Sequence, residues 1–214
     1  MSIISIYVKM LPITSLFLDG DIVMLLNNFS PAIWKIFIGN LLLLICIIFY
    51  LAWWIVTFKR NTAKRRGQAF YIAAAFIIGI ISILIIASGI AELARFPQAI
   101  PVRLILIAIA LSFLILLIVT AKVFHRAVTS ELLLIHIWAA VEICMVNSLY
   151  SSANISFSTA WICSAVILLS ILVSLICYVF YYRLCEKTRY RTGMIPLALA
   201  GLCAIAILLM LLTA

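Results

Sequence analysis

Five long apolar stretches constrain this chain more than any other feature of its sequence. They cover residues 31–58, 68–90, 102–124, 157–182 and 194–214, and charged or turn-forming residues separate each stretch from the next. About 20 mostly apolar residues are enough for a helix to cross the hydrocarbon core of a bilayer. A sixth stretch at 132–150 carries two ionisable residues and is otherwise apolar enough to insert. The pattern predicts an all-α polytopic integral membrane protein.

The composition excludes a soluble fold. Hydrophobic residues make up 68% of the chain and charged residues only 10%, whereas soluble domains are usually about 45–50% apolar and about 25% charged. The length of 214 residues is used up by six or seven spanning helices and the turns between them. We therefore expect a single transmembrane domain over residues 1–214, without an extramembrane domain.

The beginning of the chain allows more than one interpretation. Residues 3–18 are apolar, but this run is short, contains Lys9 and Pro12, and precedes an acidic turn at 19–21. It can form a seventh, short transmembrane helix or lie in the membrane interface. A cleaved signal peptide is a third interpretation, although no basic region precedes the run and no small-residue cleavage site follows it. We therefore expect seven spanning helices, or six if residues 3–18 do not cross.

The basic residues indicate the orientation of the helices. Eleven of the 15 Lys and Arg residues fall in three alternate loops, at 59–66, 121–130 and 183–193. Such residues are retained on the cytoplasmic side, so these loops are predicted to be cytoplasmic and the C-terminus to lie outside. The expected location is the bacterial cytoplasmic membrane. Anionic headgroups of the lipid bilayer explain bases beside helix ends, so we expect no nucleic-acid partner despite the net charge of +9.

A shift of 128 residues aligns two parts of the chain and suggests an internal repeat. It places residues 29–32 on 157–160 and residues 50–54 on 178–182, so both ends of two predicted helices coincide. Coinciding ends carry more weight than identities, because Leu/Ile-rich helices share many residues by chance. Two helix triplets separated by one linker helix would run parallel about an axis along the membrane normal. The predicted plan is a first repeat at 3–90, a linker helix at 102–124 and a second repeat at 131–214.

This plan is similar to that of the SWEET and PQ-loop transporters, of vitamin transporters of the PnuC type and, more distantly, of the rhodopsins. The similarity lies in helix count and repeat order. A Pro-Gln pair occurs at residues 97–98, before the linker helix rather than within a triplet, and we interpret it as part of a turn. The helix at 194–214 contains no lysine that could bind retinal. The residues themselves therefore indicate no particular family.

The sequence contains no recognisable catalytic or metal-binding motif. His125 and His136 have no Cys, Asp or His at metal-ligand spacing. No Gly-x-Ser-x-Gly turn is present. Five of the six cysteines fall within predicted helices and Cys185 falls at the cytoplasmic border, so no pair lies in outer loops where a disulfide would form. We expect that the protein is not an enzyme and holds no metal ion or other cofactor.

The predicted helix at 132–150 brings charge into the membrane interior. Glu142 lies about 12 Å below the outer surface at about 1.5 Å per residue, too deep for its side chain to reach water easily. At about 100° per residue, Trp138 and Glu142 share one stripe of this helix, while His136 and Asn147 share another about 120° away. A helix with two polar faces cannot face lipid broadly. We therefore expect it to pack at the centre of the bundle.

Glu142 is the main candidate for a functional group. It can be a structural carboxyl, protonated or hydrogen-bonded to a hydroxyl on the following helix. It can also be a ligand or proton site, because apolar surroundings favour the protonated form of a carboxyl. Lys35 and Lys9 are its candidate charge partners, and Asn40 adds an uncharged polar group one turn deeper than Lys35.

Two functions of different classes remain open. The first is a protein that binds or transports a small-molecule ligand between the helix triplets, with proton coupling through Glu142. The second is a non-catalytic accessory, immunity-type or interaction subunit that binds a membrane-protein partner. A polar cavity around Glu142 would favour the first, and a dry, closely packed interior the second. The residues predicted to line the ligand site are Glu142, Trp138, His136, Asn147, Lys35 and Asn40.

Overall fold

The structure, a computed structural model, is entirely helical over the part of the chain that it describes. Six helices occur in this part and no strand, and all six are long and apolar enough to cross a membrane. The predicted all-α polytopic membrane fold is therefore confirmed. Residues 3–18 lie outside the described part, so the seventh helix and the first repeat that contains it stay predictions. The described residues are 30–59, 65–95, 97–124, 130–181 and 186–213.

The six helices follow the predicted apolar stretches closely. The largest difference is at the start of the last helix, which begins at Glu186 rather than residue 194, and the helix Arg65–Leu93 extends three residues beyond each end of the predicted stretch 68–90. A helix can continue past the hydrocarbon core, where hydropathy no longer marks it. The helices are α3 Pro31–Lys59, α4 Arg65–Leu93, α5 Val102–Phe124, α6 Ser130–Ser151, α7 Phe157–Tyr181 and α8 Glu186–Thr213.

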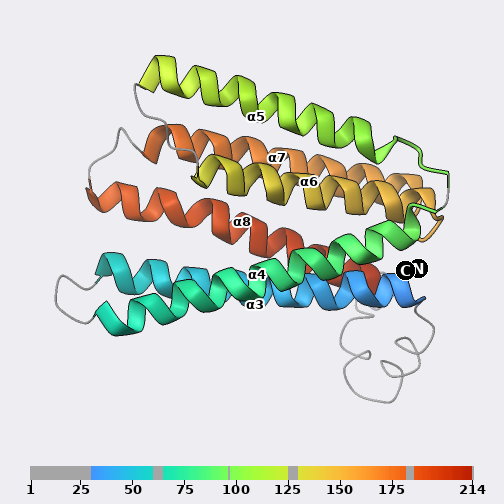
Figure 1. The fold of residues 1–214 in the computed structure, drawn as a ribbon, viewed down its shortest axis with the longest axis horizontal. Helices are drawn as coiled ribbons and strands as arrows, with labels where there is room; N and C mark the ends of the chain where they lie inside the picture. The colour runs from blue at the N-terminus through green and yellow to red at the C-terminus, as the bar shows by residue number, and fades with distance from the viewer. Residues whose placement is uncertain (1–29, 60–64, 96, 125–129, 182–185, 214) are drawn as a thin grey trace, which may run out of the picture.

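Successive helices run in opposite directions and form one bundle (Figure 1). Helices α3 and α4 pack along each other, and α8 packs against both α3 and α7. Helix α6 contacts α4, α5 and α7. In Figure 1, α5 lies at the edge of the bundle opposite α3 and α4, with α6, α7 and α8 between them. Helix α6 thus occupies a central position, whereas α5 is peripheral.

The helix ends beside the three basic loops all lie at one end of the bundle. Helices α3, α5 and α7 end there, and α4, α6 and α8 begin there (Figure 1). This arrangement is compatible with loops 59–66, 121–130 and 183–193 on one side of a membrane. The assignment of that side to the cytoplasm stays a prediction.

Small residues bring α3 and α4 into close contact. A Cβ atom added at Gly39 would overlap the side chain of Ile86, and one added at Gly89 would lie 2.9 Å from the carbonyl oxygen of Ala32. The Ser82 hydroxyl donates a hydrogen bond to the carbonyl of Gly39 (2.8 Å). Inside a membrane, such close backbone approach supplies the van der Waals contact that holds helices together. It also fixes the depth of the polar residues of α3 relative to α4.

An apolar core joins α3, α4, α6, α7 and α8. From α6 it includes Met145, Val146 and Leu149, all with at most 2% of their surface exposed. Half of the membrane-spanning window of α6 (50%) is buried, the largest share among the six described helices. The central packing predicted for residues 132–150 is therefore confirmed.

Candidate functional site

Glu142 lies in the interior of the bundle on α6, and none of its surface is exposed. Its Oε1 accepts a hydrogen bond from the indole Nε1 of Trp138, one helical turn away (3.0 Å). Its Oε2 has no hydrogen-bond partner among the described residues. A buried polar atom without a partner costs about 1–3 kcal/mol, and more when the group is charged. A proton on the carboxyl, or a ligand that donates to Oε2, would remove this cost.

Asn40 on α3 provides a second buried oxygen of the same kind. None of the Asn40 surface is exposed. Its Nδ2 donates to the carbonyl of Ile36 (3.0 Å) and to Sδ of Met145 on α6 (3.2 Å), while Oδ1 has no partner among the described residues. Met145 follows Glu142 by three positions and so lies on the same face of the helix. Met145 thus shares a helix face with Glu142 and contacts the amide of Asn40.

Met145, which shares the Glu142 face of α6, belongs to the apolar core to which α7 contributes Ile167 and α8 contributes Ile207. Cys163 donates a hydrogen bond to Sδ of Met210 (3.5 Å). Among the described residues, the Trp138 indole is the one hydrogen-bond donor to the Glu142 carboxyl, so the carboxyl has little stabilisation as an anion.

His136 faces α5 instead. Its ring lies edge-on to Phe113, with the ring centroids 5.4 Å apart and an interplanar angle of 71°. Its Nδ1 donates to the carbonyl of Leu132 (2.8 Å), since a carbonyl oxygen can only accept. This contact satisfies one ring nitrogen within the helix and orients the ring toward α5.

Asn147 holds the connection between α4 and α5 against α6. Its Nδ2 donates to the carbonyl of Ile100 (2.8 Å) and to Oε1 of Gln98 (3.3 Å), and its Oδ1 accepts from the Ile100 N–H (3.2 Å). One turn further along α6, the Ser151 hydroxyl accepts from the Ala99 N–H (2.9 Å). The side-chain amide of Asn147 thus provides hydrogen-bond partners for the backbone N–H and C=O of Ile100.

Lys35 forms an ion pair with Glu92 of α4 rather than with Glu142. The two side chains are 39% and 32% exposed, near the ends of α3 and α4. Lys9, the other candidate partner of Glu142, lies outside the described residues. The sequence analysis did not select Glu92, although an antiparallel hairpin of 31–58 and 68–90 brings it to the same end as Lys35.

The structure therefore distributes the six predicted site residues over four places. Glu142 and Asn40 are buried in the interior, and the half-buried Trp138 donates its hydrogen bond to Glu142. The two remaining residues of α6 face α5 and the α4–α5 connection, as the two-faced pattern of residues 132–150 suggests. Lys35 lies at the end of the bundle with Glu92. Among the described residues, no group of three His, Cys, Asp or Glu side chains could hold a metal ion.

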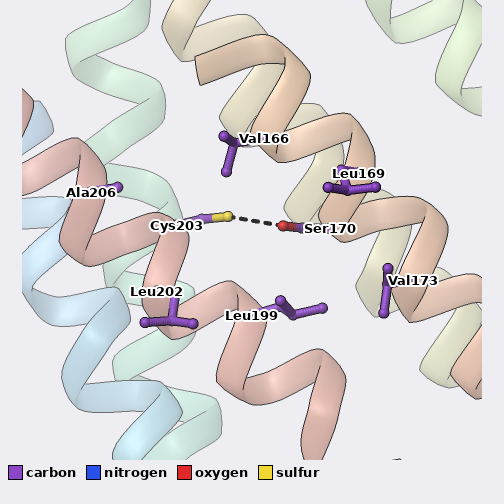
Figure 2. A pocket seen from close by; sticks show the side chains of 8 residues that line it. All are labelled: Val166, Leu169, Ser170, Val173, Leu199, Leu202, Cys203 and Ala206. Atoms are coloured by element: carbon purple, nitrogen blue, oxygen red, sulfur yellow. Dashed lines mark hydrogen bonds between the residues drawn. The ribbon is translucent and has the colours of Figure 1, made fainter. Parts of the chain in front are cut away.

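A crevice of about 360 Å³ lies between α7 and α8 (Figure 2). Ser170 of α7 and Cys203 of α8 are hydrogen-bonded across it (3.4 Å), and both are buried. The sequence analysis did not find this crevice, because a gap between two helices depends on their separation and not on their periodicity. Its lining residues are Val166, Leu169, Ser170, Val173, Leu199, Leu202, Cys203 and Ala206.

No protein-family model matches the chain, and neither a curated protein nor a solved structure is significantly similar to it. The class of the protein is therefore defined by its fold, which is that of a multi-pass, all-helical integral membrane protein.

Proposed function

We propose that the protein binds a small molecule within the membrane and couples its binding or transport to a proton on Glu142. One observation carries this proposal: Glu142 Oε2 and Asn40 Oδ1 are both buried, and neither has a donor within the described part of the chain. They belong to different helices, α6 and α3, that meet at Met145. A ligand placed here would bridge two parts of the bundle.

The energetic cost of this arrangement favours a functional role for Glu142. An ionised carboxylate in the membrane interior costs several kcal/mol unless it is paired. The Trp138 indole supplies a single hydrogen bond. A glutamine would accept the same bond without any charge, although its two N–H donors would then need acceptors. A carboxyl at this place is useful if it changes protonation or binds a donor.

The conformation of the bundle around Glu142 is closed. The carboxyl has no exposed surface, and Met145 and Leu149 on the same helix face are also fully buried. A carrier passes through such an occluded state between its outward-open and inward-open forms. Movement of α3 against α6 would open the two acceptors to a ligand.

A second function, that of an accessory or interaction subunit, is favoured by the same close packing. An interior filled by apolar side chains such as Met145, Val146 and Leu149 meets the expectation for a protein that only binds a partner. In that case Glu142 is a neutral structural carboxyl. The two functions differ in whether its proton is exchanged during activity.

The test uses Glu142→Gln in reconstituted vesicles that contain a pH-sensitive dye. Glu92→Gln is the matched control, since it removes a carboxyl from the Lys35 ion pair and leaves the core unchanged. A panel of small amines, amino acids, sugars and carboxylates is added outside at pH 5 to 8. We expect at least one solute to change the internal pH with the native chain and with Glu92→Gln, but not with Glu142→Gln.

The melting temperature of each variant is measured in parallel to show that it is folded. An equal response of Glu142→Gln and the native chain would remove Glu142 from the mechanism. The absence of any response from the native chain would favour the accessory function.

A further inference from the structure

We propose that the ligand bound in the core is a small primary ammonium ion, whose N–H groups donate to Oε2 of Glu142 and to Oδ1 of Asn40. This inference rests on the proposed function, for which it names the substrate class. It joins two observations: both oxygens are buried without a donor, and no basic side chain pairs with the carboxyl among the described residues.

Glu142 lacks a counter-charge within the part of the chain that the structure describes. The ion pair found there joins Lys35 to Glu92, near the ends of α3 and α4. Acidic side chains inside a membrane usually pair with a base or belong to the path of a substrate or ion. A cationic ligand would supply the charge that the bundle does not. The other basic side chains that the structure describes lie at or near the ends of the spanning segments: Arg95, Arg103, Lys122 and Arg191.

The contacts of Asn40 bring its amide to the face of α6 that carries Glu142. Its Nδ2 lies 3.2 Å from Sδ of Met145, which follows Glu142 by three positions, and residues three apart are neighbours on a helix surface. The same Nδ2 donates to the Ile36 carbonyl, so the donor side of this amide is used within the protein. On Glu142, the Trp138 indole occupies Oε1. Each of the two residues therefore keeps one open acceptor.

Open acceptors select a ligand that donates. A primary ammonium ion supplies three N–H donors and a positive charge, whereas a carboxylate or phosphate would add acceptors and like charge. An uncharged amide or alcohol donates but leaves a carboxylate without a counter-charge. Mg²⁺ and Ca²⁺ take about six to eight oxygen ligands, more than two open acceptors provide. An ammonium ion therefore matches this pair of oxygens best.

The single carboxyl also determines how the ligand is coupled to a proton. A carboxylate carries one negative charge, so it holds one proton or one ammonium ion at a time. When an ammonium ion binds to the protonated carboxyl, the O–H bond breaks, the proton leaves to water and the carboxylate accepts an N–H hydrogen bond. The charge of the occupied site is unchanged, which avoids the cost of an unpaired charge in the interior.

The experiment measures the melting temperature of the full-length protein in detergent with increasing methylammonium chloride. The pH is fixed and sodium chloride keeps the ionic strength constant. Potassium chloride, which has the same charge without N–H groups, and acetamide, which has N–H groups without charge, are the matched controls. A ligand that binds the folded state raises the melting temperature as its occupancy increases. We expect methylammonium to act at concentrations at least tenfold below those needed for either control.

Two substitutions test the two acceptors separately. Glu142→Gln removes the charge, and we expect it to abolish stabilisation by methylammonium. Asn40→Leu removes Oδ1 from a side chain of similar size, and we expect it to weaken the response about tenfold, since hydrogen bonds to charged groups are strong. The matched controls are Glu92→Gln, which changes the carboxyl of the Lys35 ion pair, and Asn154→Leu, which changes an amide in contact with Ser152. Both controls should respond like the native chain.

Each contrary result has a definite meaning. Equal responses of the native chain to methylammonium and potassium, or to methylammonium and acetamide, would overturn the assignment of an ammonium ion. So would the absence of any response to methylammonium, and the proposed function would stand if another solute of the vesicle panel still gave a proton response that Glu142→Gln loses.

The variants distinguish the site from the ligand class. An unchanged response of Glu142→Gln to methylammonium would overturn the site, and an unchanged proton response of this variant in vesicles would overturn the proposed function as well. If Glu142→Gln does not fold, Asn40→Leu and Asn154→Leu decide the question. Equal responses of these two variants would show that Oδ1 of Asn40 does not bind the ion.

Discussion

Helices α5 and α6 are neighbours in the bundle with opposite properties. The spanning window of α5 has a mean hydropathy of 3.1 and is 11% buried, whereas that of α6 has a mean hydropathy of 1.8 and is 50% buried. In a water-soluble protein, the more apolar helix would be the more buried one. In a bilayer the lipid chains are as apolar as leucine, so moving an apolar side chain from lipid into the protein interior lowers the free energy little. A polar side chain gains more, because it finds hydrogen-bond partners in the interior. Polar content therefore marks the central helix.

The two helices satisfy their polar groups in different ways. On α5, the hydroxyls of Ser112 and Thr120 donate to carbonyls of the same helix, those of Ile109 (2.8 Å) and Leu117 (3.0 Å). Such internal hydrogen bonds need no neighbouring helix. On α6, Asn147 bonds with the α4–α5 connection. A membrane helix can thus be peripheral despite polar residues, provided that these bond within the helix.

The largest expected effect comes from matched leucines on the two helices. Leu149 on α6 has no exposed surface, and Leu111 on α5 is 54% exposed. Leu149→Ala leaves a cavity in the core, and we expect it to lower the free energy of unfolding by roughly 2–5 kcal/mol. Leu111→Ala leaves a gap that lipid fills, with an expected change within about 0.5 kcal/mol. Denaturation in mixed micelles measures both, and equal losses would contradict the comparison.

The positions of the six described spans could be predicted because they depend on local composition, whereas the seventh span stays a prediction. Each of the six described helices needs about 20 apolar residues whatever its neighbours are. The central position of α6 could also be predicted, since His136 and Glu142 lie on different faces of one helix. These inferences use one helix at a time.

The partners of the polar residues could not be predicted from the same information. Lys35 is paired with Glu92 rather than Glu142 because α3 and α4 pack closely along their lengths. The crevice beside Cys203 depends on the separation of α7 from α8. Both features follow from the relative position of two helices, which the periodicity of a single helix does not contain.

The second expected effect concerns the attachment of α5 to α6 through the α4–α5 connection. Asn147→Leu removes three hydrogen bonds and leaves Ile100 N–H and C=O without these partners. We expect a loss of about 1–3 kcal/mol in unfolding free energy and faster hydrogen exchange in residues 97–101. The matched control is Asn154→Leu, since Asn154 contacts only nearby Ser152 through Nδ2. Unchanged exchange in 97–101 would show that Asn147 does not hold this connection.

The smallest expected effect concerns the direct contact between the two helices. The ring of Phe113 on α5 lies edge-on to the His136 ring, and aromatic pairs of this geometry contribute about 0.5–1.5 kcal/mol. Phe113→Leu keeps an apolar side chain and removes the ring contact, so we expect a loss of roughly 0.5–1 kcal/mol. Phe76→Leu on α4, where the ring is 68% exposed, is the control and should change stability less. A double-mutant cycle with His136→Leu isolates the pair from other contacts of each residue. A coupling energy of zero would mean that the ring contact between Phe113 and His136 does not help to hold α5 against α6, so that the other contacts between these helices and the connection at Asn147 supply the attachment.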